Sequence, residues 1–119
     1  MLSHSDVITF HSYKNSKELE KRILELKKIG RPVMCTEYLA RPKSNFLDCL
    51  PVMKKHDVGC FNWGLVSGKT QTIYPWTSWA WRPKIEPKVW FHDIFRKDGM
   101  AFDEREIAVI KKISSKNAH

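Results

Sequence analysis

The sequence contains no long hydrophobic run and no segment typical of export. No apolar stretch approaches the roughly 20 residues that a membrane-spanning helix needs. Residues 1–13 have neither the basic start nor the apolar core of a signal peptide. We therefore expect no membrane association, and the sequence assigns no cellular location to the chain.

Metal, cofactor and disulfide motifs are also missing. None of the usual metal-ligand spacings occurs among His4, His56, His92 and His119. The three cysteines, an odd number, form no CxxC pair. Because Cys35, Cys49 and Cys60 lie in apolar surroundings, we expect buried thiols rather than a disulfide framework. We expect no metal site and no cofactor.

Acidic residues are few compared with basic ones. The chain has 21 Lys plus Arg against 13 Asp plus Glu, which gives a net charge of +8. Such a balance makes nucleic acid or another acidic partner worth considering. The cations are scattered, however, and many decorate one solvated helix face, while RNP, KH and zinc-knuckle patterns are absent. We therefore expect no nucleic-acid partner, and a basic, aromatic-rich nucleic-acid-binding module is kept as an alternative.

The 119 residues form a single domain over 1–119 in which strand and helix patterns alternate. Strands are predicted over residues 7–13, 33–38 and 58–63. A helix capped by Asn15 or Ser16 ends before Gly30, a second starts at Ser44 or Asn45, and a third starts at Asp103. Pro51 must kink the second helix or begin a separate turn. Strand–helix repeats of about 25 residues predict an α/β fold with parallel strands joined by crossover helices.

Residues 64–100 do not continue the alternation of strand and helix patterns. They form a long segment rich in Gly, Pro and Trp. Segments of this length in compact domains usually have a function or are disordered. Flat rings such as Trp76 and Trp79 suit stacking on sugars, and Lys69 and Gln71 can bind hydroxyl groups. The alternative is that some of these tryptophans form a small satellite core.

Polar or aromatic residues end each predicted strand, where sites of parallel α/β folds lie. The first strand ends in His11 and Tyr13, the second in Glu37 and the third in Asn62 and Trp63. A carboxylate at the end of a buried strand is costly unless something pairs with it. Tyr13 can donate a hydrogen bond to Glu37, His11 can orient it, and Arg41 is a further source of charge. The simpler alternative for Glu37 is a structural salt bridge.

These strand ends carry a family resemblance. In order, His11-Ser12-Tyr13, Thr36-Glu37-Tyr38 and Phe61-Asn62-Trp63-Gly64 resemble the last three strands of a clan A glycoside hydrolase. The chain is most similar to family 5, the cellulase and β-1,4-xylanase-like enzymes, over residues 5–114. The resemblance implies strands six to eight of a (β/α)₈ TIM barrel with their helices.

The same resemblance implies a retaining hydrolysis of a polysaccharide or oligosaccharide. Glu37 would be the nucleophile, His11 and Tyr13 would position it and touch the sugar, and Trp63 would lie beneath the sugar being cleaved. Such an enzyme also needs an acid/base carboxyl about 5–5.5 Å from the nucleophile. That residue belongs to an earlier strand of the family and has no counterpart here.

The expected chain is therefore a C-terminal fragment, inactive alone, whose partner is the missing N-terminal half of the barrel. We expect self-association through exposed strand edges. Part of its apolar sheet surface should be exposed to water, at Val7, Val33, Cys35 and Phe61. A non-catalytic carbohydrate-binding remnant is the remaining alternative.

Overall fold

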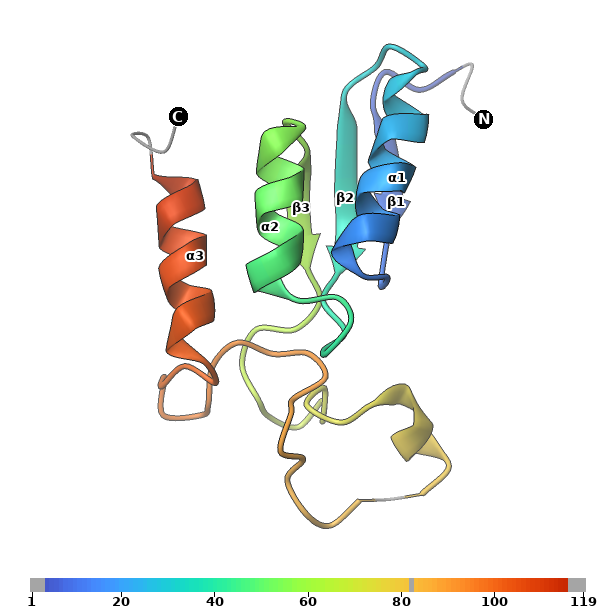
Figure 1. Cartoon of the computed structure of the whole chain (residues 1–119). Coiled ribbons are helices and arrows are strands. Elements are labelled where there is room, and N and C mark those ends of the chain that lie inside the picture. Colours follow the sequence, from blue (N-terminus) through green and yellow to red (C-terminus); the bar gives the residue numbers. More distant parts are fainter. Residues whose placement is uncertain (1–3, 82, 116–119) are drawn as a thin grey trace.

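The computed structural model describes residues 4–81 and 83–115. His119 lies outside these residues. The elements in chain order are β1 (Ile8–His11), α1 (Ser16–Lys27), β2 (Val33–Tyr38), α2 (Phe46–Lys55), β3 (Gly59–Asn62), a 3-10 turn, η2 (Trp76–Trp79), and α3 (Glu104–Ser114) (Figure 1). The alternation of strands and helices predicted from the sequence is confirmed.

Side-chain caps start the three α-helices near the predicted positions. The Asn15 side chain accepts a 3.0 Å hydrogen bond from the Glu18 backbone N–H. Asn45 and Asp103 cap α2 and α3 in the same way, through the N–H groups of Asp48 and Arg105. These bonds satisfy N–H groups that the first helical turn leaves without a partner.

Pro51 lies inside α2, which continues through it to Lys55. The proposed separate turn is therefore wrong, and the helix runs through the proline because packing on the sheet outweighs one missing hydrogen bond.

The three strands form one parallel sheet in the order β1-β2-β3. Both α1 and α2 pack on the same face of this sheet, and α3 packs beside α2 (Figure 1). The fold is thus a small α/β domain with a three-stranded parallel sheet and three helices, as the sequence predicted at this level. The carboxyl ends of all three strands point toward the long segment between β3 and α3 (Figure 1).

One face of the sheet contains the hydrophobic core. Ile8, Phe10, Val33 and Cys35 are all buried, and they pack with apolar residues of α1 and α2. The prediction that Val33 and Cys35 would be exposed to water is therefore wrong: both lie on the strand face that the helices cover, and they are 4% and 0% exposed. Side chains alternate along a strand, so their neighbours occupy the other face.

The opposite face of the sheet is largely uncovered. Thr9 and His11 of β1 are exposed, as are Gly59 and Phe61 of β3. Phe61 is 61% exposed, which agrees with the prediction, and Val7 just before β1 is 39% exposed. A parallel sheet is normally covered on both faces, so an exposed phenylalanine here is a sign of a surface that is suited to further packing.

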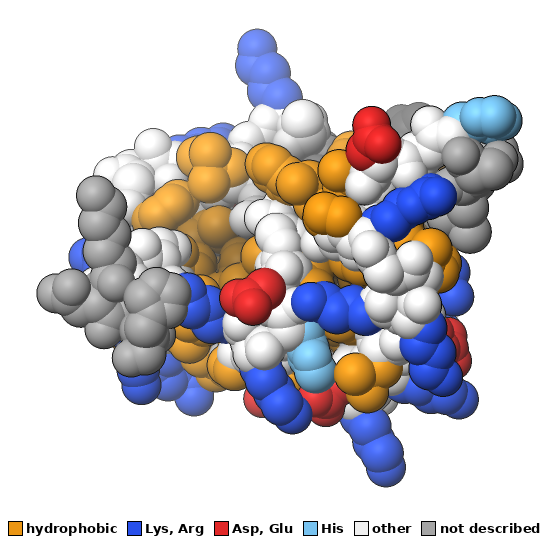
Figure 2. Space-filling view, turned by 90° about the horizontal axis from the view of Figure 1, so that it is seen from above, with side chains coloured by type: hydrophobic (Ala, Val, Ile, Leu, Met, Phe, Trp, Pro, Cys, Tyr) orange, Lys and Arg blue, Asp and Glu red, His pale blue; other side chains and the backbone are white. Residues whose placement is uncertain are grey.

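Two further features of the described residues concern the surface and the thiols. At the end of the molecule opposite the long segment, Figure 2 shows hydrophobic side chains gathered in the centre and lysine and arginine side chains projecting around them. Across residues 4–81 and 83–115, no helix has the length and apolar character to cross a membrane. Cys35 and Cys49 are buried and Cys60 is half-buried, all as free thiols.

Candidate functional site

Glu37 lies near the carboxyl end of β2, on the sheet face opposite the helices. Its Oε2 atom accepts a 2.7 Å hydrogen bond from the hydroxyl of Tyr13 and lies 3.4 Å from Nδ1 of His11. The other carboxylate oxygen, Oε1, has no partner among the described residues. The predicted convergence of His11, Tyr13 and Glu37 is therefore observed.

An irregularity in β2 gives Glu37 this orientation. Phe10 of β1 is in register with Cys35, but the next residue, His11, is in register with Glu37. Toward β3, Cys35 pairs with Cys60 and Tyr38 with Asn62. Thus β2 has one residue more than each neighbour over this stretch, which is the definition of a bulge. Strict alternation would place Glu37 on the helix-covered face with Cys35; the extra residue brings it to the face of His11.

The three side chains of this site differ in their exposure to solvent. His11 is 55% exposed and Glu37 is 28% exposed, so the carboxylate is partly shielded while the imidazole lies at the surface. Tyr13 is half-buried. Burial raises the pKa of the Tyr13 phenol well above its ordinary value, and the hydrogen bond to Glu37 acts in the same direction. Tyr13 therefore remains a hydrogen-bond donor at neutral pH.

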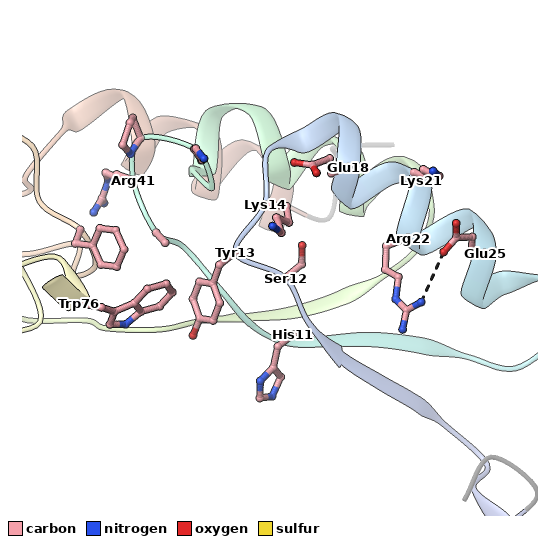
Figure 3. A pocket seen from close by; sticks show the side chains of 14 residues that line it. His11, Ser12, Tyr13, Lys14, Glu18, Lys21, Arg22, Glu25, Arg41 and Trp76 are labelled. Carbon is pink, nitrogen blue, oxygen red and sulfur yellow. Dashed lines mark ion pairs between the residues drawn. The ribbon is translucent and has the colours of Figure 1, made fainter.

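The long segment supplies an aromatic wall beside Tyr13. The Trp76 ring meets the Tyr13 ring edge-on, with centroids 5.0 Å apart, and meets Phe91 at 4.8 Å. His92 packs near both Tyr13 and Trp76. Figure 3 shows Trp76 and Tyr13 next to each other, on the side toward which His11 also points. Trp76 is 47% exposed, which leaves part of its ring available to a ligand.

Trp63, the predicted platform, follows β3 at the same end of the sheet. Its backbone N–H donates a 2.8 Å bond to the Tyr38 carbonyl, and its side chain is 47% exposed. No ring contact of Trp63 occurs within the described part of the chain. The ring is therefore accessible, next to the strand that carries Glu37.

The remaining predicted binding residues lie away from this cluster. Trp79, at the end of η2, is 88% exposed. Gln71 lines a separate cavity of about 510 Å³ between two stretches of the long segment, with Tyr74 and Trp90. Lys69 is exposed and lines neither that cavity nor the one beside Tyr13. Trp76 thus lies beside the Glu37 cluster, whereas Trp79, Gln71 and Lys69 do not.

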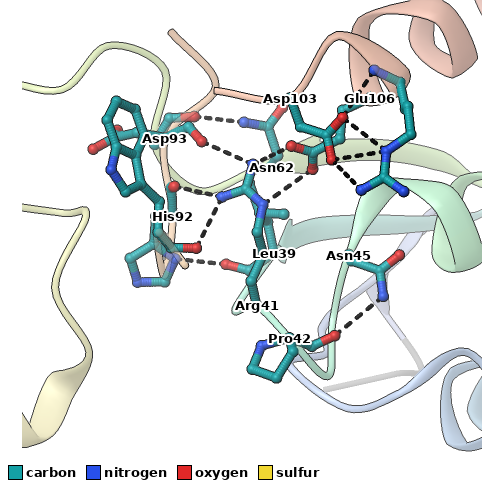
Figure 4. Close-up of polar contacts among 12 residues, drawn as sticks. Leu39, Arg41, Pro42, Asn45, Asn62, His92, Asp93, Asp103 and Glu106 are labelled. Atoms are coloured by element: carbon teal, nitrogen blue, oxygen red, sulfur yellow. Dashed lines mark hydrogen bonds and ion pairs between the residues drawn. The ribbon is translucent and has the colours of Figure 1, made fainter. Parts of the chain in front are cut away.

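Arg41 has a different role from the one the sequence suggested. It is 5% exposed, and its guanidinium donates to both carboxylate oxygens of Glu106, at 2.8 and 3.0 Å. The same guanidinium donates to the carbonyls of Trp90, His92 and Asp93 (Figure 4). The expectation that Arg41 supplies charge to Glu37 is therefore wrong, because its charge is paired with Glu106.

Glu106 lies three residues after the cap residue Asp103, which is the spacing of a capping-box partner, but its carboxylate does not take that role. Glu106 is 3% exposed, and its carboxylate pairs with Arg41 instead of the backbone at the helix start. A buried carboxylate is tolerated when a matching cation and good geometry accompany it. This pair ties α3 and the segment around residue 92 to the loop after β2.

His92 is a buried residue of the site that the sequence analysis did not assign to it. Its Nδ1–H donates to the carbonyl of Leu39, because a carbonyl oxygen can only accept. Burial lowers the pKa of His92 below its ordinary value. In the sequence, His92 comes directly after Trp90 and Phe91. This position predicts that the His92 ring is packed, but it does not predict the contact with Leu39.

The turn after Trp63 brings the chain against residues 92 and 93. Gly64 has φ +88°, and a Cβ there would lie 2.6 Å from the Asp93 backbone nitrogen and 2.9 Å from the His92 Cβ. Only glycine fits this close approach. Asp93 accepts a 2.6 Å hydrogen bond from the Thr72 hydroxyl, which joins the two stretches of the long segment.

A cavity of about 890 Å³ adjoins the site. It extends from the aromatic wall past the end of β1 to α1 and the loop after β2 (Figure 3). Aromatic rings form one part of the cavity wall, and charged side chains form another. The lining residues used below are Tyr13, Lys14, Glu18, Lys21, Arg22, Glu25, Lys43, Trp76 and Phe91.

A second carboxylate does not join Glu37 within the described residues. Glu86 accepts hydrogen bonds from the Trp90 indole N–H and from Arg96, and these bonds lower its pKa. Glu18, on α1, lines the cavity and has no ion pair with another residue that the structure describes. In the described ranges no group of three or more His, Cys, Asp or Glu side chains has a geometry suited to a metal ion. Among the described residues, the Glu37 cluster is thus one oriented carboxylate beside aromatic surfaces.

Comparison with known proteins found no relative of this chain. The chain matches no family model, no curated protein and no solved structure.

Proposed function

We propose that this chain is the C-terminal part of the catalytic domain of a retaining glycoside hydrolase, with Glu37 as its nucleophile. The observation that carries the proposal is the Tyr13–Glu37–His11 cluster at the carboxyl ends of parallel strands, next to exposed tryptophan rings. Sites of parallel α/β folds lie at this end. The resemblance of the three strand ends to family 5 supports the same assignment.

The geometry of Glu37 suits nucleophilic attack. Its Oε2 is held by the Tyr13 hydroxyl, which orients the carboxylate, while Oε1 has no partner among the described residues. In a retaining mechanism this oxygen forms a bond to the anomeric carbon as the glycosidic bond breaks. The leaving oxygen takes a proton from a second carboxyl group, and water later hydrolyses the glycosyl–enzyme ester. Trp63 and Trp76 provide flat surfaces for the sugar.

The second carboxyl group belongs, in this proposal, to a polypeptide that supplies the first five strand–helix units. The uncovered sheet face with Phe61 and the edge positions of β1 and β3 support such a partner. In a closed barrel this face becomes the packed interior, and both edges pair with further strands. The part of α3 that is half-buried on α2, including Ile107 and Ile110, offers additional apolar surface.

The experiment compares the chain alone with the chain co-expressed with a polypeptide carrying the first five units. A positioned acid contributes typically 10²–10⁴-fold to such rates. We expect little turnover of an aryl glycoside by the chain alone, and Glu37-dependent turnover by the complemented protein. A 2-deoxy-2-fluoroglycoside with an activated leaving group should add its sugar mass to the peptide containing Glu37.

The matched control is Glu86→Gln, which removes a carboxylate from the long segment and should leave labelling intact, whereas Glu37→Gln should abolish it. Labelling of a different carboxylate, or complemented turnover that survives Glu37→Gln, would contradict the nucleophile assignment.

A non-catalytic carbohydrate-binding role is the second candidate. The observation that favours it is that no second carboxylate joins Glu37 within the described part of the chain. Binding of a neutral oligosaccharide that depends on Trp76, together with no labelling of Glu37 even after complementation, would select this role.

A further inference from the structure

The cavity beside Tyr13 contains an excess of unpaired positive charge. Lys14, Lys21 and Lys43 line it, and none of the three has an ion pair among the described residues. They come from different elements: Lys14 from the loop after β1, Lys21 from α1 and Lys43 from the loop after β2. Figure 3 shows Lys14 between the Tyr13 end of β1 and helix α1.

The other charges of the cavity do not neutralise these lysines. Arg22 and Glu25 are 3.6 Å apart and compensate each other. Arg41 is neutralised by Glu106. Glu18 is the one remaining carboxylate on the lining, so three ammonium groups face a single negative charge. Like charges gathered in one concave surface repel each other, and a bound anion would relieve this repulsion.

The aromatic part of the same cavity indicates what kind of anion fits. Tyr13, Trp76 and Phe91 form a wall of rings, and Trp76 is 47% exposed. An inorganic anion gains nothing from such a wall, whereas a sugar ring can pack on it through its C–H faces. A ligand that has both a sugar ring and a negative group would use both parts of the cavity.

We propose that the glycan bound at this site is anionic, with a carboxylate or sulfate group on a sugar next to the unit held at Glu37. The anionic group lies against Lys14 and Lys43, while the neighbouring ring packs on Trp76. This inference rests on the proposed function, because it identifies the substrate class of that same site. Placing the negative group away from Glu37 avoids repulsion with its carboxylate.

The test measures the affinity of the chain by NMR titration at low ionic strength. The probes are a glucuronic-acid-bearing xylo-oligosaccharide, the same compound with its carboxylate reduced to an alcohol, a sulfated oligosaccharide of equal length, and oligouridylate. We expect the acid to bind about tenfold more tightly than its reduced form, and the difference to shrink in high salt. The acid and sulfated arms establish which anionic group is preferred.

The variant Lys14→Gln/Lys43→Gln should remove the preference for the acid without weakening binding of the reduced compound. Lys54→Gln/Lys111→Gln, on α2 and α3, removes the same charge elsewhere and should retain the preference. The inference would be overturned if the wild-type chain bound the acid and its reduced form with equal affinity. It would also be overturned if both double variants lost the preference for the acid to the same extent.

Two outcomes separate this inference from the proposed function. If acid and reduced compound bind equally, and Trp76→Ala weakens both, the anionic preference is wrong and carbohydrate binding stands. If neither compound binds to the chain alone or to the complemented protein, or if oligouridylate binds more tightly than both in a Trp76-dependent way, both the inference and the proposed function are wrong.

Discussion

The Tyr13 hydroxyl donates a 2.7 Å hydrogen bond to the Glu37 carboxylate across the neighbouring strands β1 and β2. The two residues are 24 positions apart in the chain. They meet because a bulge in β2 brings Glu37 to the sheet face of His11, and because Trp76 supports the Tyr13 ring from the side. This contact connects the fold to the proposed chemistry.

Replacing Tyr13 by Phe should destabilise the domain modestly. The change removes one hydrogen bond to a partly shielded carboxylate, which is worth about 1 kcal/mol. Urea unfolding at pH 7 measures the effect. Tyr74→Phe is the matched control, since the Tyr74 hydroxyl has no bond among the described residues, and it should change stability less. An equal effect of both changes would show that the Tyr13–Glu37 bond contributes nothing.

The stabilising effect of Tyr13 should be lost at alkaline pH. The folded pKa of Tyr13 is raised above its ordinary value of 10.0. The unfolded chain therefore releases this proton first, and its contribution to stability is full below pH 10 and falls as the pH rises above it. The difference in stability between the wild type and Tyr13→Phe should narrow as the pH is raised from 10 to 11. A constant difference would contradict the raised pKa.

His92 should make the domain less stable in mild acid. Its folded pKa is lowered from 6.5, mainly by burial. The unfolded chain then binds the proton more readily, so stability is full above about pH 6.5 and falls as the pH is lowered below it. Urea midpoints at pH 7.5 and 5.5 measure this decline. In His92→Gln, whose amide can still donate to Leu39, the decline should be smaller; an unchanged decline would assign it to other groups.

Breaking the Arg41–Glu106 pair should be the most damaging of these changes. Removal of one partner from a buried pair leaves the other charge uncompensated, at a cost of about 3–5 kcal/mol. Arg41→Met also releases three carbonyls of the long segment, so the tryptophan fluorescence of the chain should change along with the thermal midpoint. The double change Arg41→Met/Glu106→Leu should recover part of the loss. Arg105→Ala, in an exposed pair with Asp103, is the control and should have a small effect.

The uncovered sheet face should promote self-association of the isolated chain. Phe61 is 61% exposed on this face, and β1 and β3 have free edges. Phe61→Lys should shift sedimentation toward the monomer with little change in stability. Leu24→Lys, at a 49% exposed position on α1, should leave association unchanged. A wild-type chain that is monomeric at micromolar concentration with a sharp melt would contradict this expectation.

Local chemistry in the sequence was sufficient to predict the elements and the end of the sheet at which the candidate cluster lies. Asn15 and Asn45 cap helices through bonds to residues only three positions away, so their roles depend on short-range geometry. The strand–helix alternation fixed the parallel order of the strands. Because parallel strands end at a common edge, His11, Tyr13 and Glu37 could be placed together from their positions alone.

Other features depended on contacts between distant parts of the chain. The extra residue of β2 reverses the side on which Glu37 lies, and it follows from pairing with two neighbouring strands, which local pattern does not encode. Arg41 binds Glu106, 65 positions away, because burial of both groups makes mutual pairing favourable. Likewise Trp76 reaches Tyr13 and Trp79 does not, although both lie on the same 3-10 turn. The periodicity of the sequence indicates which side chains share one face of a strand or turn. Long-range packing and the pairing of buried charges decide which of these side chains come into contact.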